Sequence, residues 1–237
     1  MATKFRGISC KKISSNQLSE QVQAKFQQAL GLHKRGQIGQ AQVIYEEILR
    51  VQPKHFDSLH LLGVSAIQTG RLEYGIQLIG DAIKVNPNVA SAYNNRGNAL
   101  SGLKRLDEAL ASYDKALAIN PDYAEAYNNR GTVLSDLKRL DEALASYDKA
   151  LAINADYAEA YYNRGNALSG LKRLDEALAS YDKALAINAD YAEAYNNRGT
   201  VLSDLKRLDE ALASYDKALA IKDRKSTRLN SSHMSES

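Results

Sequence analysis

Apolar residues recur along the chain as pairs of stripes with helical spacing. In residues 90–123, the first stripe repeats at i, i+4, i+7 and i+10, which places its members on one face of a helix. The members of this stripe are Tyr93, Gly97, Leu100 and Leu103. A second stripe follows the polar turn LKRLDEA and comprises Ala109, Leu110, Tyr113, Ala116 and Leu117. The pattern predicts two amphipathic helices joined by a short turn.

The same two-stripe pattern returns every 34 residues. Six units follow one another, at 22–55, 56–89, 90–123, 124–157, 158–191 and 192–222. A fixed period of this length is typical of solenoids, in which each unit buries its apolar face against its neighbours. The sequence therefore predicts an all-α helix-turn-helix solenoid over residues 22–222.

The last four units carry a glycine in the middle of the first predicted helix, at Gly97, Gly131, Gly165 and Gly199. Such a glycine costs about 1 kcal/mol relative to alanine, so its repetition needs a packing reason. We expect the two helices of a unit to approach closely here, with the small Ala109 facing Gly97. Tyr113 and its copies are expected to fill space between neighbouring units.

Polar residues mark the predicted helix ends. Asp107 is the expected N-cap of the second helix in its unit. Pro121, in the sequence NPD, is expected to stop that helix. In later units Ala155 and Ala189 replace the proline, so the stop there is expected to depend on asparagine and aspartate alone.

The unit also has a family signature. Positions 4, 8, 20, 24, 27 and 32 hold a large residue, glycine, alanine, an aromatic residue, alanine and proline. This pattern resembles the tetratricopeptide repeat over residues 22–222. The resemblance implies a right-handed superhelix with a concave face lined by the first helix of each pair. It also implies a protein that binds a peptide or partner protein on that face and has no active site in its repeats.

A finer resemblance concerns two stretches of sequence. ALGLHKRGQIGQAQVIYEEILRVQPKHFDSLHLLGV, and later AYNNRGNAL with LDEALASYDKALAI, are similar to the N-terminal repeats of bacterial O-linked N-acetylglucosamine transferase (SPINDLY-like) proteins. In that family the repeats precede a glycosyltransferase that uses a UDP-sugar. Three alternatives therefore stand: a general interaction module, the substrate-recognition arm of such a transferase, and a scaffold for an assembly or secretion complex.

Residue patterns typical of catalytic or metal sites are missing from the sequence. No glycine-rich phosphate loop occurs, and the single cysteine, Cys10, rules out a disulfide framework within the chain. His55 and His60 are five residues apart across a predicted turn, which is not ligand spacing. Carboxylate pairs such as Asp107 and Glu108 recur at helix starts, where they favour the helix. We expect no cofactor, no metal and no active site.

Asparagine recurs at the sixth position of four successive units, at Asn95, Asn129, Asn163 and Asn197. These residues lie away from the apolar stripe, on the side expected to form the concave face. One carboxamide offers an acceptor and two donors, which match the peptide group. Similar ladders in the transferase family hold extended peptides by their main chain, whereas the alternative is that asparagine simply tolerates a solvated helix face.

The fifth-position residues are expected to flank this groove: Asn94, Asn128, Tyr162 and Asn196. Positions five and nine lack the lysines and arginines with which related repeats clamp chaperone C-termini. A carboxylate clamp of that kind is therefore not expected.

Charge and hydropathy limit the possible partners. Residues 22–222 contain 24 basic and 25 acidic residues, so this region has no net charge that would steer it to nucleic acid. The N-terminus lacks the apolar segment of a secretory signal, and no apolar run reaches the length of a membrane span. We therefore expect a cytoplasmic protein that binds neither nucleic acid nor membranes.

The two ends differ from the repeats. Residues 1–21 contain four basic residues and one acidic residue, and are expected to form a flexible basic segment. Residues 223–233, DRKSTRLNSSH, match the translation of DNA that resembles a widely used short-read sequencing adapter. We therefore interpret 223–237 as a non-native tail on a truncated fragment. With no repeat stacked on it, the last helix is expected to expose Leu212, Tyr215 and Leu219 and to allow self-association.

Overall fold

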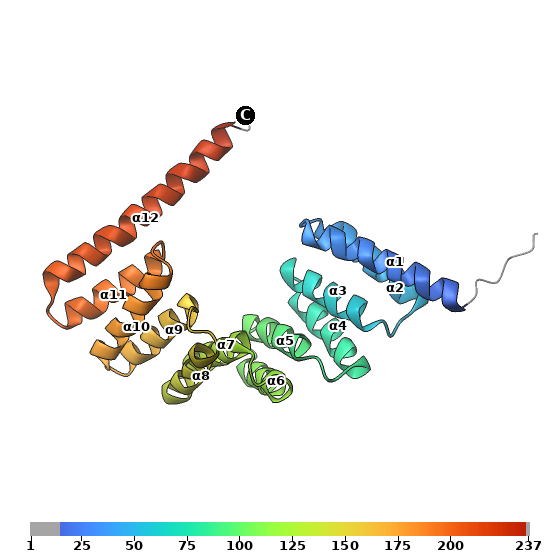
Figure 1. Ribbon diagram of the computed structural model, residues 1–237, viewed down its shortest axis with the longest axis horizontal. Coiled ribbons are helices and arrows are strands. Elements are labelled where there is room, and N and C mark those ends of the chain that lie inside the picture. The colour runs from blue at the N-terminus through green and yellow to red at the C-terminus, as the bar shows by residue number, and fades with distance from the viewer. Residues whose placement is uncertain (1–14, 236–237) are drawn as a thin grey trace, which may run out of the picture. The chain divides into compact units, whose positions relative to one another are not determined.

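Residues 15–235 are described by a computed structural model, and every regular element in this range is an α-helix. Figure 1 shows the helices in chain order. Their bounds are α1 Ser15–Lys34, α2 Ile38–Val51, α3 Phe56–Gln68, α4 Leu72–Val85, α5 Ala90–Gly102, α6 Leu106–Ile119, α7 Ala124–Asp136, α8 Leu140–Ile153, α9 Ala158–Gly170, α10 Leu174–Ile187, α11 Ala192–Asp204 and α12 Leu208–Ser235. The predicted all-α solenoid of repeats of about 34 residues is confirmed.

The chain forms two compact units, divided between Pro87 and Asn88. The first unit contains α1–α4, and its core joins Phe26, Tyr45, Ile48 and Leu62. The second unit contains α5–α12, in which each first helix packs on the second helix of its own repeat, and α7, α9 and α11 also pack on the second helix of the repeat before. This alternating packing buries the apolar stripes of both helices.

The turn between the two helices of a repeat is a Schellman motif. After α5, the N–H of Lys104 donates to the carbonyl of Ser101 and the N–H of Arg105 donates to that of Leu100, both at 2.9 Å. Lys104 has φ = 59°, in the left-handed region that usually holds glycine. The equivalent residue is Gly36 or Gly70 in the first two repeats, but lysine in the last four.

The start of the second helix differs from the sequence-based expectation. The N-cap of α6 is Arg105, two residues before Asp107, and no side chain caps the helix. The guanidinium of Arg105 instead forms a bidentate pair with the Glu108 carboxylate, with both N–O distances at 2.7 Å. This pair holds the pKa of Glu108 below its usual value. Asp107 lies in the first turn, where its charge complements the helix dipole.

The end of the second helix is the same with or without proline. Helices α6, α8 and α10 all end at isoleucine, and the next asparagine closes a small turn. The Asn120 side chain accepts from the N–H of Asp122 at 3.1 Å, and Asn154 and Asn188 do the same. The stop therefore depends on asparagine in each repeat, whether Pro121 or Ala155 follows it.

In the second unit, the glycine in the middle of each first helix lies under a tyrosine ring of its own repeat. A Cβ added at Gly97 would lie 2.6 Å from Cε1 of Tyr113, and Gly131 and Gly165 have the same relation to Tyr147 and Tyr181. The atoms nearest to the glycine therefore belong to the tyrosine ring. Tyr113, Tyr147 and Tyr181 are buried.

The ends of the helical region differ from the expected segments. Helix α1 begins at Ser15, so residues 15–21 continue the first repeat helix, while residues 1–14 lie outside the described residues. Helix α12 runs on to Ser235, through the sequence that resembles an adapter. The origin of residues 223–237 stays a prediction, and 236–237 are not described. Leu212 and Leu219 are 61% and 58% exposed, whereas Leu178 in the preceding repeat is buried.

The tyrosine over the glycine predicts opposite effects of two glycine-to-alanine changes. Gly131→Ala should lower the free energy of unfolding by about 1–3 kcal/mol, because the added methyl meets the Tyr147 ring. Gly80→Ala is the control: its Cβ would meet nothing within 4 Å, so it should raise stability by up to about 1 kcal/mol. Urea unfolding followed by circular dichroism measures both. Equal stability changes in the two variants would contradict this packing.

The left-handed turn residue gives a second pair of variants. Lys206→Gly should stabilise the protein by about 0.5–1 kcal/mol, because the left-handed strain of lysine exceeds the entropy cost of glycine. Gly70→Lys, at the equivalent turn, should destabilise it by a similar amount. Thermal unfolding of both variants checks the sign, and a loss of stability in Lys206→Gly would refute the assignment of strain.

Candidate functional site

The first helices form one continuous face in the second unit. Successive first helices contact one another, in the pairs α5–α7, α7–α9 and α9–α11. Pairs of successive second helices show no contact of comparable extent among the described residues. The stack therefore brings the first helices closest together, as expected for the inner side of a curved solenoid. Asn95, Asn129, Asn163 and Asn197 lie on these four helices and are half-buried.

Two of the fifth-position residues lie inside the protein. Asn94 and Asn128 are 0% and 1% exposed, although the sequence predicted that they flank an open groove. The Asn94 amide donates to the Glu125 carboxylate of the next repeat at 3.0 Å, and Asn128 donates to Glu159 at 3.5 Å. They are buried because the following first helix packs over them. These asparagines therefore join neighbouring repeats.

The ladder asparagines are oriented by these buried residues. Asn129 Nδ2 donates to Asn94 Oδ1 at 3.2 Å, and Asn163 Nδ2 donates to Asn128 Oδ1 at 3.0 Å. The Glu125 carboxylate can only accept hydrogen bonds, so Asn94 must turn its Nδ2 group toward Glu125. The Oδ1 atom of Asn94 then faces Asn129 and accepts from its Nδ2 group. Among residues 15–235, no group donates to the Oδ1 atoms of Asn129 and Asn163, which stay available as acceptors.

The repeat 158–191 departs from this scheme. Tyr162 replaces the buried asparagine, and its hydroxyl accepts from Asn197 Nδ2 at 3.1 Å. Its ring packs against Tyr191, with the centroids 4.8 Å apart. Asn196, the last fifth-position residue, is exposed. The four predicted flanking residues thus have three different environments, and only Tyr162 and Asn196 reach the surface.

The core tyrosines also contact the first-helix face. Tyr113 and Tyr181 donate to the Oδ1 atoms of Asn98 and Asn166, at 2.8 and 2.7 Å. Burial raises the pKa of both phenols, so they remain protonated donors at neutral pH. Asn166 Oδ1 also accepts from Asn197 at 2.9 Å. The ninth-position asparagine is therefore held by its oxygen, and its amide N–H groups face outward.

Arginine at the seventh position ties three helices together. Arg130 on α7 donates to Asp114 of the preceding repeat at 2.7 Å and to Ser146 of its own repeat at 2.8 Å. Arg164 and Arg198 repeat these contacts. These contacts join each first helix to the second helices of its own repeat and of the preceding repeat.

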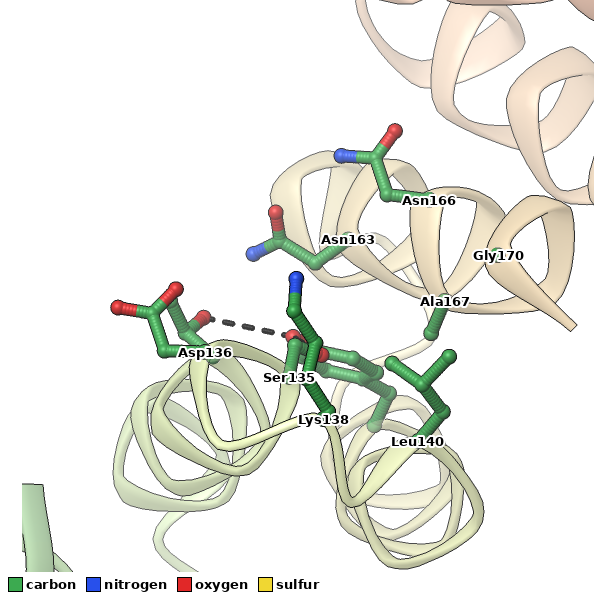
Figure 2. A pocket seen from close by; sticks show the side chains of 10 residues that line it. Ser135, Asp136, Lys138, Leu140, Asn163, Asn166, Ala167 and Gly170 are labelled. Atoms are coloured by element: carbon green, nitrogen blue, oxygen red, sulfur yellow. Dashed lines mark hydrogen bonds between the residues drawn. The ribbon is translucent and has the colours of Figure 1, made fainter.

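A pocket of about 350 Å³ opens on this face where the repeat 124–157 meets the repeat 158–191. Figure 2 shows its walls, which come from α7, the turn after it, α8 and α9. The polar lining residues are Thr132, Ser135, Asp136, Lys138, Tyr147, Asn163 and Asn166. At the next junction the corresponding pocket measures about 150 Å³. The larger pocket adjoins the ladder through Asn163.

The histidines take structural positions in the first unit. His55 caps α3, accepting from the N–H of Ser58 at 3.2 Å, and burial lowers the pKa of His60. Among the side chains that the structure describes, no three of histidine, cysteine, aspartate or glutamate gather closely enough to hold a metal ion. None of the described helices combines the length and the apolar character needed to cross a membrane.

A family model described as tetratricopeptide repeat matches the sequence over residues 88–156, 122–190 and 156–224. The chain belongs to the tetratricopeptide repeat family. No curated protein sequence matches it significantly. The comparisons give no specific link between these tetratricopeptide repeats and the glycosyltransferases.

Several solved structures share the fold. MamA is 24% identical with a TM-score of 0.65, over 70% of this chain and 97% of MamA. PilF of Pseudomonas aeruginosa is 20% identical with a TM-score of 0.74, over 89% of this chain and 99% of PilF. YrrB, described as a tetratricopeptide repeat protein with an unusual peptide-binding site, is 22% identical with a TM-score of 0.62, over 80% of this chain and 97% of YrrB.

Sequence reasoning missed the bond between Asn94 and Glu125. The signal was present, because asparagine at position five and glutamate at position two of the next repeat recur 31 residues apart. The position of Lys138 in the lining of the pocket was also missed.

The buried asparagine gives a prediction about stability. Asn94→Ala should destabilise the protein by about 1–3 kcal/mol, because Glu125 and Asn129 lose a buried partner. Asn196→Ala is the matched control at the same repeat position, and should change stability by less than about 0.5 kcal/mol because Asn196 is exposed. Urea unfolding compares the two variants, and an equal loss in both would argue against the inter-repeat role.

Proposed function

We propose that the face formed by α5, α7, α9 and α11 binds an extended peptide segment of a partner protein. The observation that carries this proposal is the orientation of Asn129 and Asn163, which are held by Nδ2 and leave Oδ1 open. Open acceptors on successive first helices suit the N–H groups of an extended main chain, which are regularly spaced. The chain then acts as an interaction module.

The other features of the face agree with this function. The ladder side chains are uncharged, so they can contact a main chain without the desolvation cost of a buried charge. They are also held rigidly by neighbouring residues, which lowers the entropy lost on binding. Of the structural neighbours, YrrB is described as having a peptide-binding site. That description belongs to YrrB, and it supports the proposal by analogy of fold only.

The transferase arm and the scaffold remain alternatives for the wider protein. Both alternatives would use the same face of the repeats. Peptide binding on this face is therefore common to the interaction module, the transferase arm and the scaffold. The transferase alternative depends on the sequence resemblance alone. A transferase domain in the natural gene would favour it.

The proposal predicts that binding depends on the ladder oxygens. A random dodecapeptide library is selected on the wild-type protein, and the affinities of recovered peptides are measured by fluorescence polarisation. The triple variant Asn129→Ala, Asn163→Ala and Asn197→Ala should bind them about 10- to 1,000-fold more weakly, since each hydrogen bond contributes about 0.5–1.5 kcal/mol.

A control variant separates this effect from a general change of surface. Lys115→Ala and Lys149→Ala alter exposed residues of α6 and α8, the second helices of their repeats, and should leave affinity unchanged. Circular dichroism must show equal helix content in all variants. Unchanged affinity in the triple variant would contradict the proposed face.

A further inference from the structure

The turn lysines of the second unit are paired at two repeat junctions and unpaired at the one between them. Lys104 Nζ lies 2.9 Å from Asp136 Oδ2 of the next repeat, and Lys172 lies 3.8 Å from Asp204. At the intervening junction the residue equivalent to these aspartates is Gly170. Within residues 15–235, Lys138 consequently has no ion-pair partner. This lysine lines the pocket of about 350 Å³.

The pocket around Lys138 is rich in hydrogen-bond donors. Asn166 Oδ1 is occupied by Tyr181 and Asn197, which leaves the Nδ2 group of Asn166 free to donate. Asn163 uses one N–H on Asn128 and keeps a second. Figure 2 shows Lys138 extending toward the side of the pocket on which Asn163 lies. A cation and two amides therefore face the same space.

The one carboxylate in the lining is already engaged. Asp136 lines the pocket, but its Oδ2 atom is paired with Lys104 of the preceding repeat at 2.9 Å. In Figure 2 its carboxylate is directed away from Lys138. The pocket thus keeps one uncompensated positive charge.

We propose that this pocket is a subsite of the peptide groove that receives a carboxylate of the ligand, with Lys138 as its cation and Asn163 and Asn166 as amide donors. The proposal rests on the proposed function, because Asn163 belongs to both the ladder and the pocket. It assigns the chemistry of one ligand position: the carboxylate of an aspartate or glutamate side chain, or of a peptide C-terminus.

A carboxylate fits the pocket better than a phosphate group does. A single lysine matches the single negative charge of a carboxylate, whereas phosphate sites generally collect arginines or several donors around two charges. The repeats themselves provide a template, because at both flanking junctions an aspartate carboxylate meets the lysine. A carboxylate of the ligand would take the place of the aspartate side chain that is missing at Gly170.

The repeat also provides the variants for a test. Gly170→Asp introduces the aspartate of the flanking junctions, and should pair with Lys138 and exclude the ligand. The new Cβ would lie 3.1 Å from Cδ1 of Leu140, the flexible end of a side chain, so the change is tolerable. Lys138→Gln removes the charge and keeps a residue of similar length. Asp204→Gly releases Lys172 and should create a second carboxylate subsite at the next junction.

The probes are two synthetic dodecapeptide libraries, one with amidated and one with free C-termini, selected on the wild-type protein. Recovered peptides should share an acidic group at one position. Replacing that group with its neutral counterpart should weaken binding to the wild type about five- to thirtyfold, and should have little effect in Lys138→Gln or Gly170→Asp. In the double variant Gly170→Asp with Asp204→Gly, the acidic preference should return in a shifted register.

The two libraries identify the source of the carboxylate. A preference that survives in the amidated library assigns the site to an acidic side chain, and one confined to the free library assigns it to the C-terminus. An equal effect of the neutral replacement in wild type and Gly170→Asp would overturn this inference but leave the proposed function, provided that the ladder variants still weaken binding. If no peptide is retained by the wild-type protein, the proposed function and this subsite both fail.

Discussion

The packing of a tyrosine ring on a glycine determines how each repeat of the second unit presents its binding face. Tyr113 lies against Gly97, and this contact brings the second helix of the repeat close to the first. The same tyrosine then donates its hydroxyl hydrogen to Asn98, which in turn accepts from Asn129 of the next repeat. One side chain therefore links the apolar core to the polar face. A shift of the ring would move the ladder as well as the core.

Regular repetition makes the exceptions informative. The second unit contains four repeats with nearly the same sequence, so a change at one position is surrounded by internal controls. Gly170 stands where the two adjacent repeats have aspartate, although Gly102 occupies the same position in the repeat 90–123, and Tyr162 stands where the other three repeats have asparagine. Both residues lie in the repeat 158–191, and both change which groups reach the inner face. The face is therefore uniform in its main-chain contacts and irregular around this repeat.

The sequence predicted the period, the helix pairs and the helices that carry the ladder, because all of these follow from hydrophobic spacing. It did not predict that Asn94 is buried, since asparagine is usually exposed and the covering helix belongs to another repeat. It indicated a close approach of the two helices at Gly97, but it did not show that the ring of Tyr113 contacts this glycine. The left-handed lysines could have been found, since Gly36 and Gly70 align with Lys104 in the repeat.

The ladder carboxamides and the Lys138 subsite contribute differently to the recognition of a peptide. Carboxamide oxygens that accept from a peptide main chain provide affinity for any extended segment, because every residue except proline has the same N–H group. Such contacts cannot by themselves distinguish one sequence from another. Discrimination needs a group that meets a side chain or a terminus, and Lys138 is unpaired because Gly170 supplies no carboxylate. A solenoid of nearly identical repeats thus gains specificity where adjacent repeats differ.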